Sequence, residues 1–117
     1  MLDQIESPVA EPELLPVFRS VPPSVRDGLL ADAIQHAVAP GTVLFEQGET
    51  PPFQLIVMTG SVQLFGVSSA KRQVLIEVVR APDLIIPAAV VSGAPYLMQA
   101  RVPEHSRLLM IPAARFR

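Results

Sequence analysis

The chain has 117 residues, a formal net charge of -2 and no cysteine. This length fits one compact domain. The 9 Lys and Arg residues are scattered along the chain. Affinity for nucleic acid depends on clustered cations, so we do not expect this segment itself to bind DNA or RNA. The lack of cysteine excludes disulfides, thiolate zinc sites and cysteine-ligated iron–sulfur clusters.

The N-terminal segment, residues 1–13, is acidic and contains proline, whereas a signal peptide begins with basic residues followed by an apolar run. The longest apolar runs are too short to span a bilayer. We therefore expect a cytoplasmic protein without a membrane partner. Residues 1–12 are predicted to form a flexible leader and residues 13–117 a single domain, with no DNA-binding domain in this chain.

Two short helices are predicted before the first strand. Pro12 stands in the first turn of one helix, whose apolar side chains are Leu14, Leu15 and Phe18. Ser24 is predicted to cap the second helix, which has an acidic first turn and an apolar side formed by Val25, Leu29 and Leu30.

From residue 33 onward the pattern changes to short strands separated by glycine and proline turns. Strands are predicted over residues 34–38, 43–45, 53–58, 62–65, 73–79, 96–102 and 107–111. We expect a tight hairpin through residues 59–61 and a last hairpin through residues 103–106. Such regular short strands indicate a β-sandwich, roll or barrel. The expected fold is mainly β, with short N-terminal helices and a truncated C-terminal helix over residues 112–117.

Several segments in the right order carry a resemblance to a known family. They are residues 40–49 (PGTVLFEQGE), 56–64 (IVMTGSVQL) and 99–112 (QARVPEHSRLLMIP), preceded by the two helices. Together they resemble the cyclic-nucleotide-binding-like sensor domain of CRP/FNR superfamily transcription regulators, over residues 15–116. The resemblance implies a double-stranded, jelly-roll-like β-roll. The glycines of these motifs are expected to form turns and the apolar residues to form the core. None of them is expected to bind a ligand or to act in catalysis.

The resemblance places the ligand site of the family in the segment before the last strands. Ligand-binding members carry Gly-Glu there, then a short helix, then Arg with Ser or Thr. The helix N-terminus and the Arg hold the cyclic phosphate, and the Glu holds the ribose. Here Gly-Glu falls on Ile86-Pro87, and the Arg pair falls near Pro95, Tyr96 and Leu97. An anion in an apolar pocket without a counter-charge is disfavoured. We therefore expect that the domain does not bind cAMP or cGMP in the usual way.

The same segment supplies the candidate pocket for a non-nucleotide small-molecule effector or haem. Its residues are Pro87, Ala88, Ala89, Val90, Val91, Tyr96, Leu97 and Met98. In the alternative interpretation, which we favour, these side chains fill the space of a nucleotide and leave a collapsed core.

Neither histidine is predicted to bind a metal. His36 shares a strand face with Ile34 and Val38, and we interpret it as a partly buried structural histidine rather than an axial haem ligand. His105 lies in a predicted turn, where we expect it to be solvated. No metal-ligand spacing is present, which also argues against a metal-binding cupin. No serine has a matching His–carboxylate pattern, so we predict no catalytic residue and no enzyme.

The resemblance implies a regulatory, effector-sensing domain of a CRP/FNR-like transcription regulator that acts in signal transduction. The full-length protein is expected to be a homodimer through a helix following Arg117, and the effector would shift that helix to reposition a helix-turn-helix. The alternative is a degenerate, ligand-free β-roll that acts as a protein-interaction or dimerisation module. The low charged fraction, 17%, is consistent with such a module.

Overall fold

The computed structural model describes residues 15–116, so the predicted leader and the first turn of the first predicted helix lie outside the described residues. The helical elements are the 3₁₀ turns η3 (Pro16–Phe18) and η4 (Ala113–Phe116) and the α-helices α1 (Pro23–Leu30) and α2 (Pro87–Ser92). The strands are β1 (Ile34–Val38), β2 (Val43–Phe45), β3 (Phe53–Thr59), β4 (Ser61–Val67), β5 (Gln73–Arg80), β6 (Asp83–Ile85), β7 (Gln99–Arg101) and β8 (Ser106–Pro112).

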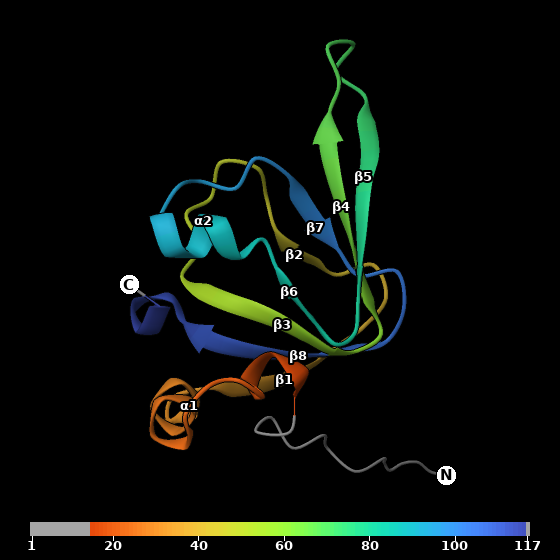
Figure 1. The fold of residues 1–117 in the computed structure, drawn as a ribbon. Coiled ribbons are helices and arrows are strands. Elements are labelled where there is room, and N and C mark those ends of the chain that lie inside the picture. Colours follow the sequence, from red (N-terminus) through yellow and green to blue (C-terminus); the bar gives the residue numbers. More distant parts are fainter. Residues whose placement is uncertain (1–14, 117) are drawn as a thin grey trace, which may run out of the picture.

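The strands form two four-stranded antiparallel sheets that face each other (Figure 1). Sheet A has the order β1-β8-β3-β6, and sheet B has the order β2-β7-β4-β5. This arrangement confirms the predicted mainly-β, jelly-roll-like fold. It also leaves two pairs of edge strands, β1 with β2 and β5 with β6, at the sides of the roll.

Two predicted hairpins are wrong, because each turn carries the chain from one sheet to the other. β3 pairs with β6 and β8, whereas β4 pairs with β5 and β7. In the same way β7 lies in sheet B and β8 in sheet A. A short glycine turn is compatible with a hairpin or with a corner between sheets, so the local signal does not separate them. The hairpin between β4 and β5 is present, as the polar turn at residues 68–71 predicts.

The second helix begins two residues earlier than predicted. Pro23 is its first residue, Pro22 stands at the N-cap position, and no side chain caps the helix. Ser24 therefore lies inside the helix instead of capping it. Proline is favoured at the first helical position because its missing N–H needs no partner there.

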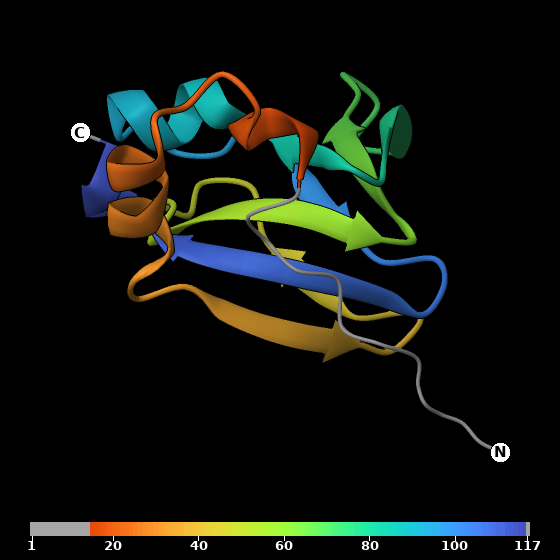
Figure 2. The ribbon, with the colours of Figure 1, turned by 60° about the horizontal axis from the view of Figure 1, so that its bottom comes forward.

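Apolar side chains are buried in two layers. The larger cluster fills the space between the sheets and includes Phe45, Val57, Leu64 and Leu108. The second cluster lies on the other side of sheet A and is formed by Leu15, Phe18, Ile56, Met58, Leu109 and Ile111, with Leu29 and Leu30 of α1 against it. Figure 2 shows the N-terminal helical segments covering this outer face of sheet A. The central strands β8 and β3 of sheet A are thus buried on both faces, which explains the almost continuous burial along β3.

Candidate functional site

The segment that resembles the family's ligand site runs from β6 almost directly into α2. β6 ends at Ile85, and Ile86 then adopts φ 42° and ψ 61°, in the left-handed region, directly before α2. The buried side chain of Gln54 supports this junction. Its Nε2 donates to the carbonyl oxygens of Leu55 at 2.8 Å and Ile85 at 3.0 Å. The backbone turn that usually favours glycine is therefore present, although isoleucine occupies it.

A hollow of about 240 Å³ lies between α2 and the loop that follows it. Half of the candidate pocket residues line this hollow, namely Ala88, Ala89, Leu97 and Met98. The rest of its wall is formed by Ile86, Ser92, Ala94 and Pro95. The structure therefore brings four of the eight predicted side chains to one place and adds four neighbours that were not among the candidate pocket residues.

The other four candidate residues point elsewhere. Val90 is fully buried, and Pro87 and Val91 are exposed. Successive residues of an α-helix point to different sides, so a run of five helical residues cannot line a single hollow. Tyr96 is 2% exposed and stacks on Phe45 in the core between the sheets.

The hollow beside α2 offers no cation to a phosphate. Ser92 is the one hydroxyl in its wall, and its Oγ contacts the Ala89 carbonyl oxygen at 3.4 Å and accepts from the Ala94 N–H at 3.2 Å. Residues 84–100 contain no Asp, Glu, Lys, Arg or His. Arg101 follows, but its Nη2 donates to Gln73 at 2.6 Å and Gln99 at 2.8 Å. The geometry suits an apolar molecule better than an anion.

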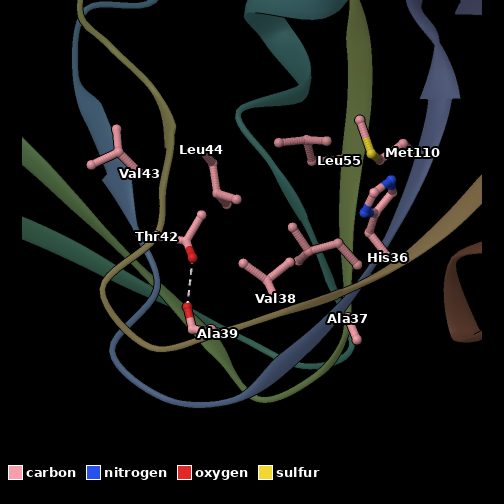
Figure 3. Close-up of a pocket in the computed structure, with 10 residues that line it drawn as sticks. His36, Ala37, Val38, Ala39, Thr42, Val43, Leu44, Leu55 and Met110 are labelled. Atoms are coloured by element: carbon pink, nitrogen blue, oxygen red, sulfur yellow. Dashed lines mark hydrogen bonds between the residues drawn. The ribbon is translucent and has the colours of Figure 1, made fainter.

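A second and larger hollow lies where the roll is open between β1 and β2. It measures about 350 Å³. Figure 3 shows Val38, Leu44, Leu55 and Met110 around it, with the imidazole of His36 beside Met110. Its remaining wall is formed by Ala37, Ala39, Thr42, Val43 and Leu108.

His36 is exposed, which corrects the expectation of a partly buried histidine. The predicted inward-facing position of His36 on β1 is confirmed. His36 pairs with Leu108, and the Leu108 side chain belongs to the core between the sheets. The imidazole nevertheless remains accessible because β1 is an edge strand and no strand continues the sheet beyond it. The sequence pattern reports the face of a residue but does not tell whether its strand lies at an edge.

A third hollow of about 210 Å³ adjoins the second one along the same side of the roll. Both are lined by Leu44, Leu55 and Met110, and the third hollow extends to Phe53, Phe45, Glu49, Pro52 and Tyr96. Burial, and to a lesser degree the negative charge of Glu49, raises the pKa of Tyr96 to about 12. The Tyr96 hydroxyl therefore stays protonated at neutral pH.

Within residues 15–116 no group of three or more His, Asp or Glu side chains is placed to hold a metal ion. In the same part of the chain, every helix is too short or too polar to cross a membrane.

A search of curated proteins found no match to this sequence. Solved structures with the same fold include a proposed cAMP-binding regulatory protein from Silicibacter pomeroyi DSS-3, with a TM-score of 0.80 and 24% identity over 89% of this chain and 48% of that chain. The sensor domain of the transcriptional regulator DNR from Pseudomonas aeruginosa has a TM-score of 0.76 and 19% identity, over 86% of this chain and 67% of that domain.

The catabolite activator protein from Thermus thermophilus has a TM-score of 0.74 and 19% identity, over 86% of this chain and 47% of that chain. This chain thus spans about half the length of the Silicibacter and Thermus proteins. Residues 35–117 match the family model for the cyclic nucleotide-binding domain. This match covers most of the sequence and agrees with the resemblance carried by the strand motifs, and the chain therefore belongs to the cyclic nucleotide-binding domain family.

Proposed function

We propose that this chain is the regulatory, effector-sensing domain of a CRP/FNR-like transcription regulator and that it does not bind cAMP or cGMP in the usual way. The exclusion of cAMP and cGMP is supported by the hollow beside α2, whose wall contains one hydroxyl and no charged side chain. A cyclic phosphate moved from water into such a site would lose its hydration without gaining a counter-charge. Domain membership supports the regulatory role, and the chemistry of the segment supports the exclusion of the nucleotide.

Isothermal titration calorimetry with cAMP and with cGMP tests the exclusion. The expected result is no saturable heat at up to millimolar nucleotide, because each missing charged hydrogen bond weakens binding by about tenfold or more. Micromolar binding of either nucleotide would overturn the proposal. Val67→Arg, at a side chain that is 57% exposed and lies outside this hollow, serves as a control for non-specific attraction of the phosphate to a single cation.

We further propose that two copies of the full-length protein pair through a helix that continues from η4, and that the effector shifts this helix. The coding sequence downstream of Arg117 tests the regulator role. A dimer helix followed by a helix-turn-helix is the expected continuation, and a stop codon directly after Arg117 would contradict it.

The second candidate function is a ligand-free interaction or dimerisation module. It is favoured by the apolar side chains exposed on one hairpin and around α2, which are Val67, Val74, Leu75, Ile76, Val91 and Leu97. Exposed apolar surface of this kind marks interaction sites. A thermal-shift screen against haem and small effectors separates the two functions, since stabilisation by a ligand supports the sensor and a flat screen supports the module.

A further inference from the structure

Sheet A ends in an open edge at β1. The strand order places β8 on one side of β1 and no strand on the other side. In Figure 2, β1 forms the lower border of the roll, and no other strand or helix within residues 15–116 lies beyond it. The main-chain groups along this side of β1 therefore have no strand partner in the described part of the chain. Such a row of N–H and C=O groups is a template for pairing with another chain.

The edge at β1 lacks the features that protect the other three edge strands of the described residues. Natural edges are commonly protected by short length, charge, proline or a bulge. β2 and β6 have three residues each. β5 contains Glu77 and Arg80, and its register with β4 shifts at residues 64 and 65. β1, with the sequence IQHAV, has five residues, pairs with β8 in unbroken register and contains no Asp, Glu, Lys, Arg or Pro. Pairing is therefore least opposed at β1.

The sequence of β1 is complementary to a second, antiparallel copy of itself. In a two-fold symmetric pair of antiparallel strands, the axis passes through one residue, and opposite side chains point to the same face. With the axis at His36, Ile34 lies opposite Val38 of the second copy, and both are inner-face, β-branched residues. Gln35 and Ala37 of the outer face form the next pair. Ile34, which is 48% exposed, thereby gains an apolar neighbour, and no pair joins two like charges.

We propose that two copies of this chain associate by antiparallel pairing of their β1 strands, with the two-fold axis at His36. Their two four-stranded sheets A then form one continuous sheet. The proposal does not rest on the sensor function, and the contact is made by this domain without the helix proposed to follow η4. Pairing along five residues is small compared with stable interfaces, which bury about 1,200–2,000 Å². We therefore expect a weak, concentration-dependent dimer.

Sedimentation velocity measured over a series of protein concentrations tests the association. The expected result is a monomer–dimer equilibrium, and a monomer at every concentration up to about 1 mM would overturn the proposal. Amide hydrogen exchange locates the contact in the unaltered protein. The amides of β1 should exchange more slowly at high than at low protein concentration, whereas those of β5, the other long edge strand, should not change.

His36 tests the register, because it faces itself in the proposed pair. His36→Glu and His36→Lys each place two like charges side by side at the axis, so each should weaken the dimer by at least about tenfold. An equimolar mixture of the two variants places opposite charges there and should restore association. Both variants stay net negative, since the chain carries -2 and each change alters this by one. Attraction between oppositely charged molecules therefore does not explain a rescue.

Val74→Glu and Val74→Lys form the matched control pair on the edge strand β5. Val74 is 43% exposed and His36 is also exposed, so none of the four changes is expected to unfold the domain, which circular dichroism checks. The Val74 variants should change the dissociation constant by less than about twofold. The proposal fails if they weaken the dimer as much as the His36 variants do. A dimer that survives both His36 changes, or a mixture that stays monomeric, would also exclude it.

Discussion

The aromatic ring of Tyr96 lies flat on the ring of Phe45, with the ring centroids 3.6 Å apart and the ring planes at 11°. Phe45 ends β2, and Tyr96 belongs to the loop between α2 and β7. Both side chains are at least 95% buried. The stack therefore anchors the loop that carries the candidate site to sheet B.

Loss of this stack is expected to destabilise the domain strongly. Tyr96→Ala should lower the free energy of unfolding by about 3–5 kcal/mol, because it removes a buried ring and leaves a cavity. Tyr96→Phe keeps the ring and should change it by less than about 1.5 kcal/mol. Urea unfolding followed by circular dichroism measures both variants. Similar losses for Ala and Phe would show that the ring stack is not what anchors the loop.

The raised pKa of Tyr96 predicts a loss of stability in alkaline solution. The ordinary value of 10.0 applies to the unfolded chain, and the pKa of the folded state is about 12. The folded state therefore favours the protonated hydroxyl, so its contribution is complete below pH 10 and is lost as the pH rises toward 12. Urea unfolding across this range, with phenolate absorbance as the titration signal, measures the effect. Tyr96→Phe should lack this component, and an equally steep decline in that variant would contradict the assignment.

Replacement of glycine by alanine should destabilise the domain much more at Gly60 than at Gly41. Both glycines have φ of +87°, where an L-residue is strained by about 1–2 kcal/mol. A Cβ at Gly60 would also overlap the Ser106 hydroxyl and lie 2.8 Å from the Ser106 Cβ and 2.9 Å from the His105 carbonyl oxygen. Nothing lies within 4 Å of a Cβ at Gly41. Gly60→Ala should therefore lower the free energy of unfolding by about 1–3 kcal/mol more than Gly41→Ala. If urea unfolding gave the same loss of unfolding free energy for Gly60→Ala and Gly41→Ala, the close contact between Gly60 and Ser106 would be contradicted.

The two neighbouring isoleucines before α2 should respond differently to glycine. Ile86→Gly removes a half-buried side chain at a cost of about 1–2 kcal/mol, but it also relieves left-handed strain of about the same size. Its free energy of unfolding should thus stay within about 1 kcal/mol of the unaltered protein. Ile85 is fully buried in a strand, so Ile85→Gly should cost about 4 kcal/mol or more. Chemical unfolding of both variants checks this contrast, and a large loss for Ile86→Gly would argue against backbone strain at that position.

Seven of the eight strands within residues 15–116 were predictable because they depend on local patterns, whereas β6 was not predicted. Alternation placed His36 on the inner face of β1, and glycine turns marked the ends of β2 and β3. The two supposed hairpins were not predictable, since the same turn residues serve a hairpin and a corner between sheets. At Gly60 the difference is decided by β8, which occupies the place beside β3 that β4 would take in a hairpin.

The sequence by itself determined the β-roll class, the family resemblance and the absence of charge from residues 84–100, because these follow from residue type and order. Only the tertiary structure decided which side chains share a hollow. In the structure, Ala88 of α2 and Leu97 of the following loop line the same hollow. Tyr96 instead stacks on Phe45 in the core. The tertiary structure also brought His36 to the open side of the roll, next to Met110 of a strand far away in sequence. The physical reason is that a cavity is formed by strands paired over long range, and that pairing depends on how the whole core packs.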